Sequence, residues 1–97
     1  MVAIIENWSR LEGRVTTVTP APDASAFSVV RVAVSQVSDV ADFPNLLADA
    51  AGSTLEVYVA NELAERLHLA PGQRVRCRVR RGGPTRIYAH PDEVDVL

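Results

Sequence analysis

Apolar and polar residues alternate along five segments of the chain, which is the pattern of strands with one buried face. The third segment is the clearest, because Leu55, Val57 and Val59 alternate with Glu56 and Tyr58. Valine occurs fifteen times and dominates the aliphatic residues, and its β-branched side chain favours strands. The pattern predicts five strands, over residues 11–19, 27–37, 54–60, 73–81 and 85–90.

Two of these strands carry irregularities. Gly13 stands in the middle of the first strand, which predicts a bulge or a tight bend there. In the second strand Phe27 and Val29 are out of phase with Val30 and the valines that follow it. A β-bulge near Val29 and Val30 would reconcile the two halves and bend the strand.

Between the third and fourth strands the sequence predicts one short helix. Asn61 is a suitable N-cap, Leu63 and Leu67 share a face, and a Pro-Gly pair at 71–72 ends the helix. Residues 37–53 leave two interpretations open. They form either a short helix that begins at Pro44 or a structured loop.

Three strands, a short helix and two further strands are the element order of an OB-fold, a five-stranded Greek-key barrel. A bent second strand and a glycine in the first suit the coiled sheet of such a barrel. The 97 residues are too few for two cores. We therefore predict an all-β protein with a single OB-fold domain over 1–97 and one short helix between strands three and four.

Two segments resemble molybdate-binding MOP/TOBE modules. Residues 9–15 (SRLEGRV) are similar to the opening of those modules, and residues 61–75 (NELAERLHLAPGQRV) to their helix, turn and following strand. The resemblance implies an OB-like fold and oxyanion binding at a site assembled between subunits. The lysine that follows the last strand in that family has only Arg80 or Arg81 in its place here.

The basic residues are all arginine, ten in number, and the formal net charge is −2. That acidity argues against strong non-specific nucleic-acid binding, in which phosphate contacts dominate the affinity. On the fourth strand the arginines alternate with Val75, Cys77 and Val79, so they share one face. They continue into the loop between strands four and five, which helps to form the ligand site of an OB-fold. Six arginines fall within thirteen residues: Arg74, Arg76, Arg78, Arg80, Arg81 and Arg86.

Four of the five aromatic residues divide into two groups. Tyr58 is expected to point outward from the third strand and Tyr88 lies on the fifth, so that with Arg31 they would form a platform on which bases stack. Phe27 and Phe43 are assigned to the core. Guanidinium groups suit phosphates, because their planar fork donates two parallel hydrogen bonds. The predicted ligand-binding residues are Arg31, Tyr58, Arg80, Arg81, Arg86 and Tyr88.

The leading hypothesis is a non-enzymatic module that binds single-stranded nucleic acid weakly. One alternative is a protein-interaction module that uses the 37–53 segment through Phe43, Leu46 and Leu47. Another is the oxyanion binding implied by the MOP/TOBE resemblance. A structural alternative also stands, in which the arginines of an exposed strand pair with carboxylates such as Glu56, Asp92 or Glu93.

Other classes of function have no signature in the chain. The two histidines and the single cysteine lack the spacing of a zinc site, and no motif of a known catalytic site occurs, so we expect no metal, no cofactor and no enzyme activity. No apolar run approaches the ~20 residues of a membrane span. Residues 1–6 do not resemble a signal peptide, so the expected location is cytoplasmic. The oligomeric state is left open.

Overall fold

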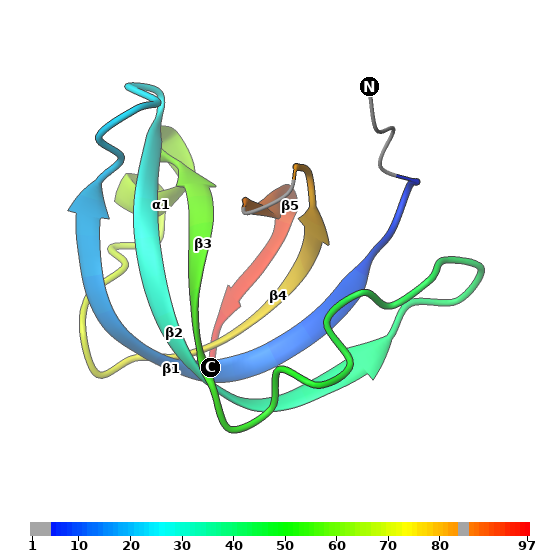
Figure 1. Ribbon diagram of the computed structural model, residues 1–97. Helices are drawn as coiled ribbons and strands as arrows, with labels where there is room; N and C mark the ends of the chain where they lie inside the picture. The colour runs from blue at the N-terminus through cyan, green and yellow to red at the C-terminus, as the bar shows by residue number, and fades with distance from the viewer. Residues whose placement is uncertain (1–4, 84–85) are drawn as a thin grey trace.

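The five predicted strands all form in the computed structural model, which describes residues 5–83 and 86–97 (Figure 1). The strands make a closed barrel in the order β1-β2-β3-β5-β4, with β4 paired back to β1. The prediction of an all-β, five-stranded barrel with a short helix between strands three and four is therefore confirmed. The elements are β1 (Ser9–Pro20), β2 (Phe27–Asp39), β3 (Thr54–Ala60), α1 (Asn61–Arg66), β4 (Arg74–Arg81) and β5 (Ile87–Val96).

The barrel is closed by a parallel seam between β3 and β5, whereas its other four strand pairs are antiparallel. The seam pairs Val57 with Ile87 and Tyr58 with Tyr88. Val57 and Ile87 are buried inside the barrel. Because side chains alternate between the two faces of a sheet, the two tyrosines stand together on the outside of the same seam.

Gly13 lies where β1 crosses close to β2. A Cβ atom at this position would lie 2.6 Å from Val32 Cγ1 and still closer to the carbonyl oxygen of Ala33. The pairing of β1 with β2 also shifts beside Gly13, which leaves Ser35 as an extra residue in β2. The irregularity predicted at Gly13 is present, and its cause is the close approach of two backbones.

The bulge predicted near Val29 and Val30 is wrong. β2 pairs with β3 without a break along this segment. The second register shift between β1 and β2 leaves Thr16 of β1 unpaired instead. Val30 faces the core, whereas Val29 is only 7% exposed and yet lies outside the core cluster. Both residues are apolar because both faces of β2 are covered at this point, so no change of phase is needed.

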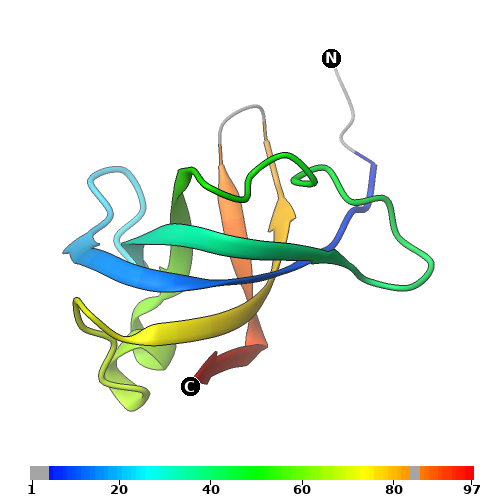
Figure 2. The same ribbon diagram turned by 90° about the horizontal axis from the view of Figure 1, so that it is seen from below.

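The core fills the inside of the barrel with side chains from every strand. Cys77 belongs to it, as predicted, and Leu63 and Ala64 of α1 close one end. In Figure 2 the helix and the 40–53 loop lie on opposite sides of the barrel. The most deeply buried aliphatic side chains are Leu11, Val15, Val32, Val57 and Val79.

Asn61 does not cap α1, so this part of the helix prediction is wrong. The N-cap is Ala60, which offers no side-chain hydrogen bond. The amide of Asn61 instead accepts a hydrogen bond from Ser28 Oγ (2.7 Å) and donates one to the carbonyl oxygen of Ser25 (2.8 Å). The side chain thus fastens the start of the helix to the loop between β1 and β2.

The segment 40–53 is a loop of turns, so the loop interpretation is right and the helix from Pro44 does not form. Asn45 provides the reason. Its Oδ1 accepts hydrogen bonds from the Leu47 amide (3.0 Å) and from Ser9 Oγ (2.6 Å), and its Nδ2 donates to Asp39 (2.9 Å). A local side-chain-to-backbone bond of this kind competes with helical hydrogen bonding.

β5 continues well beyond the predicted end at His90, as far as Val96. After Ala89 pairs with Val79, the chain bulges outward and resumes pairing at Val94, opposite Cys77. Val94 is buried in the core, which accounts for the return of the chain to the barrel. The predicted beginning of this strand, at Thr85, lies outside the described residues.

Replacing Gly13 with alanine should destabilise the barrel by about 2–3 kcal/mol, because the new methyl group overpacks a backbone contact that cannot yield. Chemical denaturation measures the effect. Thr17→Ala, at an exposed position on the same strand, should change stability by only about 0.5 kcal/mol. Equal effects of the two substitutions would contradict the close approach.

Alkaline pH should destabilise the protein through Cys77. Burial raises the pKa of this thiol from 9.0 to about 12. Between these values the unfolded chain binds fewer protons than the folded one, so stability falls as pH rises, by at most about 1.4 kcal/mol per pH unit. Urea denaturation from pH 8 to 11 should give a shallower decline for Cys77→Val than for the natural protein. Parallel declines would show that the thiol does not contribute.

Candidate functional site

Three aromatic rings meet on the outer surface of the barrel, over the seam between β3 and β5. These are Phe27 from β2, Tyr58 from β3 and Tyr88 from β5, here called the aromatic cluster. The ring centroids of Tyr88 lie 5.6 Å from those of Phe27 and of Tyr58, and Phe27 and Tyr58 are 6.3 Å apart, in tilted and edge-on arrangements. The sequence predicted Phe27 to be a core residue, and this prediction is wrong. The side chain of Phe27 points outward from β2.

Two arginines lie against the tyrosines of this cluster. The Cζ atom of Arg80 is 5.2 Å from the ring centroid of Tyr88, and that of Arg86 is 5.1 Å from the ring centroid of Tyr58. Both distances suit cation–π attraction. Within residues 5–83 and 86–97, Arg80 has no carboxylate in ion-pair contact. The structure thus brings together four of the six predicted ligand-binding residues.

Asp23, on the loop between β1 and β2, reaches into the same place. Its Oδ1 accepts a hydrogen bond from the hydroxyl of Tyr58 (3.2 Å), and its Oδ2 forms an ion pair with Arg86. The other terminal nitrogen of Arg86 donates to the hydroxyl of Tyr88 (3.3 Å). These bonds to Tyr88 and Asp23 raise the pKa of Arg86 above its ordinary value. The pKa of Tyr58 is raised by desolvation and by the negative charge of Asp23.

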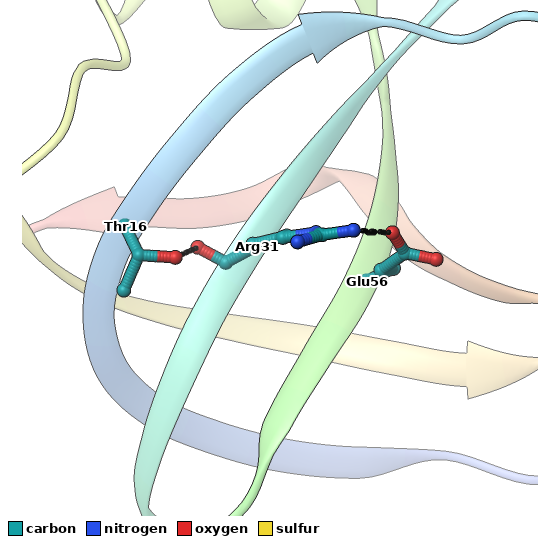
Figure 3. Close-up of polar contacts among 3 residues, drawn as sticks. All are labelled: Thr16, Arg31 and Glu56. Atoms are coloured by element: carbon teal, nitrogen blue, oxygen red, sulfur yellow. Dashed lines mark hydrogen bonds and ion pairs between the residues drawn. The ribbon is translucent and has the colours of Figure 1, made fainter.

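Arg31 borders the aromatic cluster, but its guanidinium group is paired with the carboxylate of Glu56. It stands opposite Glu56 in the β2–β3 register, and its Nε and Nη2 donate to Glu56 Oε2 at 3.1 and 3.0 Å (Figure 3). The same figure shows Thr16 Oγ1 donating to the backbone oxygen of Arg31 (3.4 Å). Arg31, Glu56 and Tyr58 line one shallow groove. Both charged side chains are more than half exposed, so the pair contributes only about 0–1 kcal/mol to stability.

Arg81 lies apart from the aromatic cluster. The Asn7 side chain accepts from its amide (2.8 Å) and donates to its carbonyl oxygen (2.9 Å), which anchors the end of β4. Arg81 borders a hollow beside the 40–53 loop, together with Asn45 and Leu55. Gly82, which follows it, packs against Tyr88, whose ring carbons would lie 2.8 and 2.9 Å from an added Cβ. In the loop between β4 and β5, residues 84 and 85 lie outside the described part of the chain.

The arginines of β4 do not form one continuous basic face. Arg76 pairs with Glu12 of β1 (2.6 Å) and Arg78 with Glu93 of β5 (3.0 Å). The neighbouring strands thus supply carboxylates between the guanidinium groups. The structural interpretation of the arginine run applies to this part of β4, whereas Arg80 at its end faces an aromatic ring instead.

Arg78 is the centre of a second aromatic contact. Its Cζ lies 4.6 Å from the Trp8 ring centroid and 5.7 Å from that of Phe43, and Trp8 also packs on His90 at 5.3 Å. Phe43 is half-buried here and does not belong to the core cluster, contrary to the prediction. With its charge paired to Glu93, Arg78 fastens the 40–53 loop and the segment before β1 to the barrel.

The three apolar residues of the expected interaction surface in the 37–53 segment lie in different environments. Leu47 is 4% exposed and belongs to the core, and Phe43 packs on Arg78. Only Leu46, at 40% exposure, faces outward among the three apolar residues on which that hypothesis depended.

The described residues contain neither a cluster of metal ligands nor a helix that could span a membrane. Among residues 5–83 and 86–97, no three His, Cys, Asp or Glu side chains are grouped so that they could hold a metal ion. Within the same ranges, no helix combines the length and the apolar character needed to cross a membrane.

Comparison with protein-family models, with curated proteins and with solved structures finds no match to this chain. Function is therefore inferred from the geometry of the described side chains.

Two members of the site, Phe27 and Asp23, were missed by the sequence analysis. The outward position of Phe27 could have been predicted from the sequence, since this apolar residue is out of phase with the inward valines of β2. The role of Asp23 could not have been predicted, because it stands in a turn-forming stretch and its partner Arg86 is 63 residues away in the sequence.

Truncation of Leu47 to alanine should destabilise the protein by about 2–4 kcal/mol, because a buried side chain is removed from the core. Leu46→Ala, one residue away and exposed, should change stability by only about 0.5 kcal/mol. Chemical denaturation of both variants provides the comparison. A small loss for Leu47→Ala would restore the 40–53 loop as a free apolar surface.

Proposed function

We propose that this protein is an OB-type barrel that binds single-stranded nucleic acid weakly through the aromatic cluster, Arg80 and Arg86. The observation that carries the proposal is the gathering of two tyrosines and two guanidinium groups on one outer face of the barrel. Bases stack on aromatic rings and on the planes of arginine side chains, and the same arginines donate hydrogen bonds to phosphates.

The position of the cluster supports the proposal as well as its composition. OB-folds bind oligonucleotides on the face of strands two and three, between the loops that join strands one to two and four to five. Phe27 and Tyr58 belong to β2 and β3, and Asp23 lies in the first of those loops. Arg80 and Arg86 flank the second.

The expected binding is weak, and its salt dependence is shallow. The net charge of the protein is −2, and the carboxylates of Asp23 and Glu56 lie beside the arginines of the site. Few phosphates are neutralised in such a site, so counterion release supplies little affinity. Stacking on Tyr58 and Tyr88, worth about 1–3 kcal/mol per base, then provides a large share of the binding free energy.

Titration with short DNA and RNA oligomers at low salt, followed by fluorescence, tests the proposal. Binding is expected with a Kd of about 100 µM or tighter, the range of non-specific complexes. Tyr58→Ala and Tyr88→Ala should each weaken it by about five- to a hundredfold through the loss of one stacked base. Circular dichroism of each variant verifies that the barrel is folded.

Two matched arginine variants distinguish binding at this site from a general effect of positive charge. Arg80→Gln should weaken binding and reduce the salt slope by about 0.7, the effect of one phosphate contact on a single strand. Arg74→Gln, at the far end of the same strand and also exposed, removes the same charge and should leave affinity almost unchanged. Equal losses for the two variants, or no binding by the natural protein at about 100 µM, would refute the proposed site.

A further inference from the structure

We propose that Arg86 and the hydroxyl group of Tyr58 form a phosphate-binding site that the carboxylate of Asp23 occupies as an internal competitor. The inference rests on the proposed function, since it assigns the position of one phosphate of the bound strand. It also adds a regulatory element, because the protein's own loop competes with its ligand.

The contacts of Asp23 are those of a bound anion. Each of its two carboxylate oxygens has a separate partner, the Tyr58 hydroxyl for one and the Arg86 guanidinium for the other. Arg86 is held in place by its bond to the Tyr88 hydroxyl and by its stacking on the Tyr58 ring. A guanidinium that is fixed in this way presents its fork without further loss of side-chain freedom.

A phosphodiester can take the place of this carboxylate and bind to the same partners. Each carries a single negative charge and two free oxygens that accept hydrogen bonds, so the Tyr58 hydroxyl and Arg86 can serve either one. A terminal phosphate carries more charge and a third oxygen, and it should compete better still.

The carboxylate is also accessible to competition. The side chain of Asp23 is 52% exposed and that of Arg86 is 35% exposed, and exposed ion pairs contribute little to stability. Release of Asp23 need not unravel its loop, which is held independently. The Ala21 amide donates to the Phe27 carbonyl (3.1 Å), and the Asn61 side chain donates to that of Ser25 (2.8 Å).

The variant Asp23→Asn tests the competition, because it removes the charge and keeps an oxygen that can accept from Tyr58. Oligomer affinity should rise about two- to fivefold, the range set by one exposed ion pair. The salt slope should steepen by about 0.7 as Arg86 takes up a phosphate. Asp42→Asn, on the distant 40–53 loop, is the matched control for net charge and should produce neither change.

The double variant Asp23→Asn/Arg86→Gln should lose the gain, because the competitor and its site are then both removed. If the natural protein and Asp23→Asn have the same affinity and the same salt slope, the proposed competition is wrong. The proposed function would still stand in that case, provided that Tyr58→Ala loses binding. Asp23→Ser replaces Asp23→Asn if thermal denaturation shows that the latter does not fold. Failure of both to fold would make Asp23 a structural residue and would also overturn the inference.

Inorganic phosphate provides a readout that does not depend on nucleic acid. In Asp23→Asn, titration with phosphate should shift the NMR signal of the Arg86 Nε–H group until the site is saturated. The double variant has no arginine at position 86, so this signal and its shift should both be missing. If no oligomer binds but this shift occurs, the phosphate site stands and the nucleic-acid proposal fails. If phosphate causes no shift, the phosphate site is overturned.

Discussion

Closure of the barrel depends on the short parallel seam between β3 and β5, where two pairs of the described residues are in register. Inside the seam, Val57 and Ile87 are buried in the core. Outside it, Tyr58 and Tyr88 pack on each other and on Phe27 from β2. Both faces of the seam are therefore covered by side chains, and the cover on the outside is also the candidate binding surface.

This double role constrains what the aromatic cluster can do. Its rings meet in tilted and edge-on arrangements, so each tyrosine is already engaged along part of its surface. Phe27 and Val29 extend this outer apolar layer across β2, which explains why two successive valines are buried on opposite faces. A ligand that stacks here adds to a packed layer and does not need to open a new one, which keeps the cost of binding low.

Sequence pattern predicts this protein best where one face of a strand meets solvent. The alternation in β3 and β4 gave their positions and their inward residues correctly. It failed at Phe27, where both faces are covered, and beyond His90, where acidic residues obscured the return of Val94 to the core. The partnership of Asp23 with Arg86 could not be predicted, because it depends on two loops that only the closed barrel brings together.

The arginine run shows how the same closure redistributes charge. In sequence the run suggests one basic face, but β1 and β5 bring carboxylates beside Arg76 and Arg78. Arg86 is different, because it stacks on Tyr58 at the same time as it holds Asp23. In the exchange that we propose, a phosphate would take the place of that carboxylate while the guanidinium stays on the ring of Tyr58. In the proposed exchange the guanidinium is already oriented for an anion, so the rearrangement required of the protein itself is the displacement of Asp23.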